Sequence, residues 1–148
     1  MNPAVREIFL ILRTSGYAIC YTLEFFIMEQ KKTLVLGASE NPSRYANIAI
    51  NRLVAHNEPT VAIGLRKGKV AGVEIKTEKF PFPDIHTVTL YLGPPRQVEY
   101  YDYILSLNPR RVIFNPGTEN PEFYKLLREK GIEIEVACTL VMLSTRQY

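Results

Sequence analysis

Cysteine and histidine are scarce in this chain, which has two of each among its 148 residues. The cysteines, Cys20 and Cys138, lie far apart and form no CxxC or Cys/His spacing of the kind that holds a metal ion. Neither a structural zinc site nor a disulfide framework is therefore predicted. The reducing cytoplasm is the expected location.

A strong excess of charge of one sign is also lacking, because 18 Lys and Arg residues face 15 Asp and Glu residues, for a net charge of +3. A nucleic-acid-binding protein usually carries a strongly basic stripe, so no nucleic-acid partner is predicted. The composition, 47% hydrophobic and 22% charged, is that of an ordinary globular domain that can build a core without metal or disulfides.

A long hydrophobic run covers residues 9–28 and approaches the length of a membrane span. Arg13 and Glu24 interrupt it, and no small-residue cleavage site follows it. Three interpretations of residues 1–28 stay open. They are a translated leader or loose appendage upstream of a natural start at Met28, a peripheral helix packed on the domain, and a membrane anchor, which is the least favoured.

Residues 29–148 carry a repeating pattern that predicts one domain. Strands are expected at residues 33–36, 60–63, 88–92, 111–114 and 132–136. Helices are expected at residues 43–57, 97–107 and 121–130, with a short closing helix from residue 139. The Gly- and Lys-rich stretch 66–73 is expected to be a loop. The pattern predicts a Rossmann-like, doubly wound α/β fold, with a mainly parallel five-stranded sheet and helices on both faces.

In an open parallel sheet, ligands bind beyond the carboxyl ends of the strands, near the point where the strand order reverses. Small and polar residues follow all five predicted strands, and this agreement is a stronger indication of a site than any single motif. The segments are Gly37-Ala38-Ser39, Gly64-Leu65-Arg66-Lys67, Gly93-Pro94, Asn115-Pro116-Gly117 and Ala137-Cys138-Thr139.

The loop after the first predicted strand has the features of a phosphate-binding turn. Gly37 permits a tight turn and close approach of a diphosphate. The following helix directs its free N–H groups at the same anion. Ser39 and Ser43 add hydroxyl donors, and Arg44 can make a bidentate phosphate contact. The alternative, a capped helix with a solvated Arg44, stays open because one glycine is a weaker signal than a full GxGxxG pattern.

The loop after the second predicted strand bears on which nucleotide is bound. NAD-binding proteins place an Asp or Glu there, whereas this chain has Arg66 and Lys67. Two cations at this place favour a ligand with an additional ribose phosphate, which both coenzyme A and NADP carry. Plain NAD is disfavoured.

The run GASENPSR at residues 37–44 resembles the GAS-x-NP-x-R opening of the stand-alone CoA-binding domain proteins. These are similar to the CoA-binding domain of succinyl-CoA synthetase α-subunits. The resemblance extends over residues 32–144 and implies that coenzyme A or an acyl-CoA is the cofactor, with NADP less favoured. It implies a diphosphate at the first loop, the nucleotide beside Gly93 and Pro94, and pantetheine near the last two strands. The predicted cofactor-binding residues are Gly37, Ala38, Ser39, Pro42, Ser43, Arg44, Arg66, Lys67, Gly93, Pro94, Asn115, Gly117 and Cys138.

No catalytic residue and no metal ligand is predicted. His56 ends the first predicted helix and His86 precedes the third strand, so both are expected at the surface, away from the ligand edge. No Ser-His-Asp order and no pair of site carboxylates is visible. For Cys138, a mixed disulfide with the thiol of bound coenzyme A is one hypothesis. A small buried residue under the loop is the favoured interpretation.

Together these features predict a module that binds a small-molecule nucleotide cofactor, most simply coenzyme A or an acyl-CoA, without chemistry of its own. The alternative is an NADP-binding oxidoreductase or a subunit of one, for which no substrate domain or proton donor is visible. A regulatory or interaction subunit with a decayed nucleotide site is a third hypothesis, and the retained glycine and cations argue against it. Association of the chain into a homo-oligomer stays open.

Overall fold

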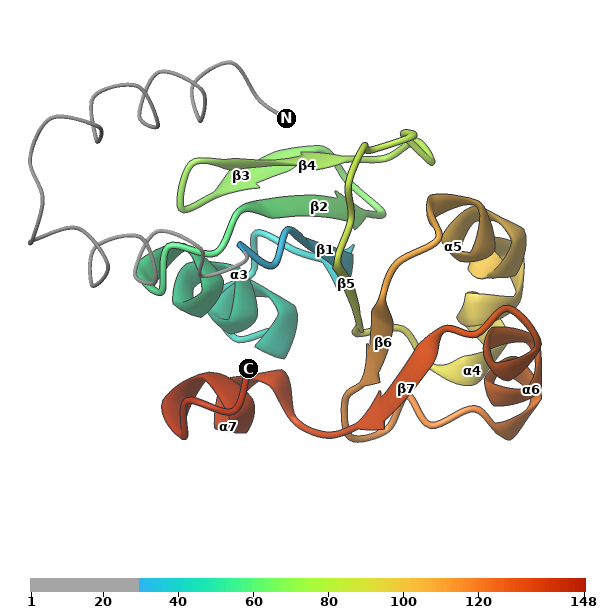
Figure 1. Ribbon diagram of the computed structural model, residues 1–148. Helices are drawn as coiled ribbons and strands as arrows, with labels where there is room; N and C mark the ends of the chain where they lie inside the picture. Colours follow the sequence, from blue (N-terminus) through green and yellow to red (C-terminus); the bar gives the residue numbers. More distant parts are fainter. Residues whose placement is uncertain (1–29) are drawn as a thin grey trace, which may run out of the picture. The chain divides into compact units, whose positions relative to one another are not determined.

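The computed structural model describes residues 30–148, which form a twisted sheet covered by helices (Figure 1). The strands are β1 (Thr33–Ala38), β2 (Thr60–Gly64), β3 (Gly68–Val70), β4 (Val73–Lys76), β5 (Thr87–Leu90), β6 (Arg111–Phe114) and β7 (Glu133–Val136). They form one sheet in the order β3-β4-β2-β1-β5-β6-β7. Every neighbouring pair is parallel except β3 with β4. The fold is therefore Rossmann-like α/β with a mostly parallel sheet.

The expectation of five strands is wrong, because the sheet has seven. Residues 66–73, expected to be a loop, contain β3 and the first residue of β4. The two strands are joined by Ala71 (φ 48°) and Gly72 (φ 82°), a two-residue turn in which both residues have positive φ. Such turns usually carry Asn-Gly or Asp-Gly. The pair Ala71-Gly72 lacks that signal, so the hairpin could not be predicted from the sequence pattern.

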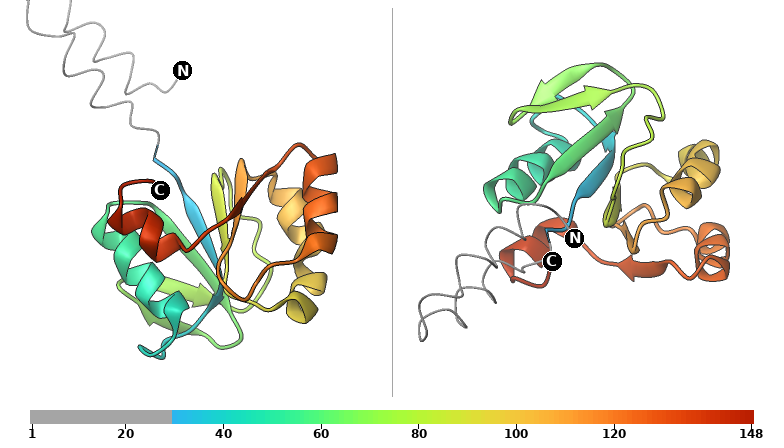
Figure 2. Two further views of the ribbon diagram at one scale, coloured as in Figure 1. Left: turned by 90° about the horizontal axis from the view of Figure 1, so that it is seen from below. Right: turned by 45° about the horizontal axis from the view of Figure 1, so that its top comes forward.

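Helices cover both faces of the sheet, as Figure 2 shows. Alternate residues of β1 point to opposite faces: Val35 packs with Ile50 and Leu143 on one face, while Leu34 packs with Phe123 on the other. The first face is covered by α3 and α7, and the second by the remaining helices. The helices are α3 (Tyr45–Ala55), α4 (Pro94–Gln97), the 3₁₀-helix η1 (Val98–Tyr100), α5 (Tyr101–Leu107), α6 (Pro121–Glu129) and α7 (Thr139–Ser144).

The strand order reverses between β1 and β5. From β1 the chain adds β2 and then the β3–β4 hairpin on one side, and it adds β5, β6 and β7 on the other. The segments that leave β1 and β5 therefore diverge, and they open a crevice at the carboxyl ends of these two strands.

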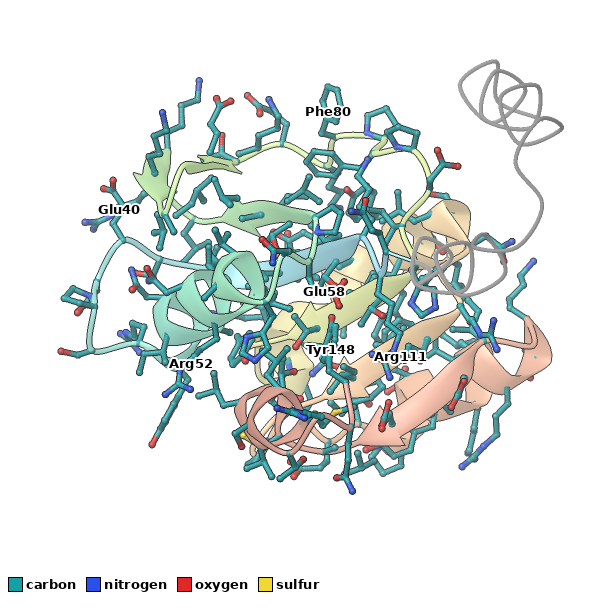
Figure 3. The ribbon with its side chains drawn as sticks, turned by 60° about the vertical axis from the view of Figure 1, so that its left-hand side comes forward. Glu40, Arg52, Glu58, Phe80, Arg111 and Tyr148 are labelled. Carbon is teal, nitrogen blue, oxygen red and sulfur yellow. The ribbon has the colours of Figure 1, made fainter. Side chains whose placement is uncertain are left out.

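The opposite, amino edge of the sheet is filled by side chains. Arg111 donates to a carboxylate oxygen of Glu135 at 3.0 Å, and its guanidinium lies 4.7 Å from the centre of the Tyr148 ring (Figure 3). The Tyr148 hydroxyl is hydrogen-bonded to the hydroxyl of Thr33. The segment after α7 thus lies against the amino ends of β1 and β6 and covers this edge of the sheet.

Within residues 30–148, no helix has both the length and the apolar character needed to cross a bilayer. The leader, peripheral helix or anchor considered for residues 1–28 lies outside the described residues.

Candidate functional site

A cavity of about 680 Å³ opens at the carboxyl edge of the sheet, where the strand order reverses. Its volume is that of a small-molecule or cofactor site. Its walls come from the segments that follow four parallel strands, β1, β2, β5 and β6. The lining residues are 37–41, 44–46, 65–67, 91, 92, 96 and 116–118. The segments at residues 37–44 and 65–67 are called the first loop and the second loop below.

The first loop is held in shape by its own polar groups. The backbone N–H of Asn41 donates to Ser39 Oγ (3.2 Å), and the N–H of Ser43 donates to Asn41 Oδ1 (2.9 Å). From α3, Asn47 donates its side-chain amide to the carbonyl oxygens of Ser39 (3.0 Å) and of the next residue (3.1 Å). These bonds leave the Ser39 hydroxyl hydrogen available to an acceptor such as a phosphate oxygen.

Helix α3 begins at the cavity wall. Arg44 is its N-cap residue but makes no side-chain capping bond, and the first helical turn contains no acidic residue. The first two helical residues, Tyr45 and Ala46, line the cavity. The positive end of the helix dipole therefore lies at the cavity, an arrangement that favours an anion.

Four cationic side chains line the cavity: Arg44, Arg66, Lys67 and Arg96. All four residues are exposed, and within residues 30–148 none of them is paired with a carboxylate. Glu40 supplies the one carboxylate among the lining residues that the structure describes. The excess of positive charge favours a ligand with several negative charges.

The cavity also has an apolar rim. Tyr45 is 71% exposed and Leu65 is 70% exposed, the highest values among the large hydrophobic side chains of the described residues. Both line the cavity beside cations, Arg44 in the first loop and Arg66 in the second. A flat aromatic group carrying phosphates would meet apolar surface and positive charge together.

Gly37 lies inside β1, one residue before its end, so the expectation of a tight turn after the strand is wrong: the residue forms an irregularity in the strand instead. Its φ of 96° interrupts the pairing of β1 with β2, where the register shifts between Leu36 and Ala38. A Cβ at this position would lie 3.0 Å from the backbone carbonyl group of Tyr91. Glycine is therefore required here both by the positive φ and by the close approach of the segment after β5.

Tyr91, which follows β5 directly, is one of the residues that line the cavity. Its hydroxyl is buried and makes no hydrogen bond among the described residues. Burial raises the pKa of Tyr91 to about 12, although the nearby hydroxyls of Thr139 and Thr89 lower that pKa in part. The phenol is therefore neutral at physiological pH, and the two threonine hydroxyls offset only part of the effect of its burial.

Tyr91→Phe is expected to raise the free energy of unfolding by about 1 kcal/mol at neutral pH, because it removes a buried hydroxyl without a partner. In the wild type, unfolded Tyr91 loses its proton near pH 10 while folded Tyr91 keeps it to about pH 12. Stability must therefore fall as the pH rises from 10 to 12. Urea unfolding at pH 7, 10 and 11 measures both effects. An unchanged pH dependence in the variant would contradict the assignment.

The cavity brings together about half of the residues predicted from the sequence. Those that line it are Gly37, Ala38, Ser39, Arg44, Arg66, Lys67 and Gly117. Those that lie outside the lining are Pro42, Ser43, Gly93, Pro94, Asn115 and Cys138.

Asn115 has a structural role that explains its place outside the lining. Its amide donates to Thr89 Oγ1 (2.7 Å) and to the carbonyl of Leu90 (2.9 Å), and its Oδ1 accepts from the N–H of Thr139 (2.9 Å). It is buried and ties β5 and β6 to the start of α7. These bonds use both amide hydrogens, so the side chain has no donor left for a ligand.

Other predicted positions lie at helix starts. Gly93 is the N-cap of α4 and Pro94 its first residue. Cys138 is the N-cap of α7 and a half-buried free thiol. Ser43 gives its backbone N–H to Asn41 within the first loop.

The cavity also contains residues that the sequence reasoning missed. Arg96 follows two prolines in the first turn of α4, and Tyr45 follows Arg44 directly. The signal for Arg96 was its place just after a predicted strand, on the edge expected to bind a ligand. Glu40 and Tyr91 gave no such signal, because neither residue type is typical of a phosphate site.

The fold and the cavity define a Rossmann-like α/β protein with a cationic crevice at the switch point of its sheet. A family model described as a CoA binding domain matches residues 31–144. The chain therefore belongs to the CoA-binding domain family.

Several solved structures are similar to this chain. A crystal structure of an uncharacterized protein has a TM-score of 0.78 and 49% sequence identity, covering 80% of this chain and 98% of that chain. A hypothetical protein from Pyrococcus horikoshii OT3 has a TM-score of 0.72 and 25% identity, covering 86% and 90%. A Thermus thermophilus protein, with a TM-score of 0.72 and 23% identity over 86% and 98%, shows the fold alone. A comparison with curated proteins found no match.

Proposed function

We propose that this chain binds coenzyme A or an acyl-CoA in the cavity at the carboxyl edge of its sheet, and that it acts as a binding module without catalysis of its own. Membership of the CoA-binding domain family supports a coenzyme A-type ligand. The observation that carries the proposal is the set of four unpaired cations around the cavity, beside the start of α3. Coenzyme A carries a diphosphate and a 3′-phosphate, so it supplies the negative charge that this cavity lacks.

Each part of the ligand has a proposed place. The diphosphate lies at the first loop, where the Ser39 hydroxyl and Arg44 donate to its oxygens. The second loop brings Arg66 and Lys67 to the ribose 3′-phosphate. The adenine ring lies against the apolar rim of Tyr45 and Leu65.

The pantetheine arm is proposed to leave the cavity past residues 116–118, on the β6 side. Cys138 lies outside the lining, so a mixed disulfide with the coenzyme thiol requires the arm to extend beyond the cavity. Intact-mass measurement after incubation with oxidised coenzyme A tests this hypothesis. An adduct absent from Cys138→Ser supports it, and no adduct on the wild type contradicts it.

Calorimetric titration of the full chain with coenzyme A, dephospho-CoA, NADP and NAD tests the proposed function. We expect coenzyme A to bind, and dephospho-CoA to bind at least about tenfold more weakly, because one charge-assisted phosphate contact is lost. Binding of NADP alone would replace the proposal with the oxidoreductase alternative. No heat from any of the four would remove the cavity as a nucleotide site.

A further inference from the structure

The first loop packs closely against the residues at both ends of the second loop, Gly64 and Gly68. A Cβ on Gly64, which precedes the second loop, would lie 2.3 Å from the carbonyl oxygen of Ala38. A Cβ on Gly68, which follows it, would lie 2.3 Å from the side-chain Cδ of Glu40. Only three residues lie between these contacts, and two of them are Arg66 and Lys67.

The Glu40 side chain, which lies against Gly68, also accepts a hydrogen bond from the strand that follows the second loop; this bond between Glu40 and Lys69 is called the clasp below. Glu40 Oε1 accepts from the backbone N–H of Lys69 at 2.8 Å. Lys69 lies in β3, an edge strand whose outward N–H has no neighbouring strand to bond. The backbone carbonyl of Glu40 accepts from Asn47 of α3 at 3.1 Å, so this residue links the start of α3 to β3. Figure 3 shows Glu40 at the side of the molecule where the hairpin begins.

The charge of Glu40 makes its position unexpected in a cavity for phosphates. A carboxylate beside Arg66 and Lys67 repels a phosphate group and lowers its affinity. The bond to Lys69 gives a compensating advantage, because a loop fixed before binding loses less conformational entropy when the ligand arrives.

We propose that Glu40 is a positioning residue, which orders the second loop through Lys69 and so directs Arg66 and Lys67 at the ribose phosphate of a nucleotide coenzyme. This inference rests on the proposed function for the identity of the ligand. The clasp itself rests only on the geometry of Glu40, Gly68 and Lys69.

Three variants separate the effect of the hydrogen bond between Glu40 and Lys69 from the effect of the negative charge of Glu40. Glu40→Gln keeps an oxygen that accepts from Lys69 but removes the charge. Gly68→Ala keeps the charge but adds a Cβ in the space of the Glu40 side chain, which must then move away. Glu40→Ala removes both. Gly68 has no positive φ, so alanine is tolerated there by the backbone.

The readout is the ratio of the dissociation constants of dephospho-CoA and coenzyme A, which reports recognition of the 3′-phosphate alone. Glu40→Gln is expected to bind coenzyme A more tightly and to give a ratio at or above that of the wild type, because it removes the repelling charge and keeps the acceptor for Lys69. Gly68→Ala and Glu40→Ala are expected to lower the ratio about fivefold to tenfold. A wild-type ratio in Gly68→Ala would overturn the proposal, and so would a lowered ratio in Glu40→Gln.

Hydrogen exchange of the Lys69 amide in the ligand-free chain gives a second readout that is independent of any coenzyme. It is expected to be about tenfold faster in Gly68→Ala than in the wild type and Glu40→Gln. A wild-type chain that binds no coenzyme overturns the proposed function. Slower hydrogen exchange of the Lys69 amide in the wild type than in Gly68→Ala would then still support the clasp. Equal exchange rates in these two proteins would overturn it.

Discussion

Arg44→Ala should weaken the binding of coenzyme A about 10- to 150-fold, the loss expected when one charge-assisted hydrogen bond to phosphate is removed. The side chain stands at the N-cap of α3, where it makes no capping bond, and it lines the cavity beside the first helical turn. Its charge and the helix dipole therefore act on the same anion. Calorimetric titration of the variant with coenzyme A measures the loss.

Arg52 provides the matched control, because it lies in the last turn of the same helix, is exposed and does not line the cavity. Arg52→Ala removes the same charge from the chain and is expected to leave the affinity within about twofold of the wild type. Arg44→Lys should recover part of the affinity, since it restores the charge but not the paired donors of a guanidinium. Equal affinities in Arg44→Ala and Arg52→Ala would remove Arg44 from the site.

Five of the parallel strands, β1, β2, β5, β6 and β7, could be predicted because each is a short run of apolar and β-branched residues next to a Gly, Pro or Asn, whereas β4, which pairs in parallel with β2, was missed. Residues 111–114 were expected as a strand and form β6, and residues 60–63 lie within β2. The helix expected at residues 97–107 is instead divided into α4, η1 and α5 and begins at Pro94. There the tertiary structure prevails over the periodicity, because buried Gln97 bonds the carbonyl oxygens of Leu92 and Thr118 and so holds the first turn against the next loop.

The edge of the sheet that carries the candidate site could be predicted from the sequence, but the full set of residues that line the site could not. The cations of the two loops follow predicted strands, and a parallel sheet brings such segments together. Side-chain direction was not predictable in the same way. Asn115 follows β6 just as Ser39 follows the last residue of β1, yet Asn115 points into the protein and bonds Thr139, whereas Ser39 lines the cavity. The role of Glu40 depends on β3, a strand that no sequence signal indicated.

The end of β1 leaves no room for a side chain at Gly64 of β2. The register of the two strands shifts there, so that Ala38 rather than Gly37 pairs with Gly64. An added Cβ would stand 2.3 Å from the Ala38 carbonyl oxygen and 3.0 Å from the side chain of Ile75 in β4. The first of these neighbours is backbone in the centre of the sheet, and it cannot move aside without displacing the first loop.

Gly64→Ala is therefore expected to lower the free energy of unfolding by about 3 kcal/mol, the upper range for overpacking a core, and the melting temperature by about 10 °C. Gly93→Ala is the matched control. A Cβ there would meet no atom closer than 3.9 Å, and the φ of −65° suits any residue, so its effect should stay within about 1 kcal/mol. Thermal and urea unfolding followed by circular dichroism compare the two variants with the wild type. Because the contact at Gly64 also fixes the near end of the second loop, any Gly64→Ala protein that remains folded should lose discrimination between coenzyme A and dephospho-CoA. Wild-type stability in Gly64→Ala would show that β1 and β2 do not approach this closely in solution.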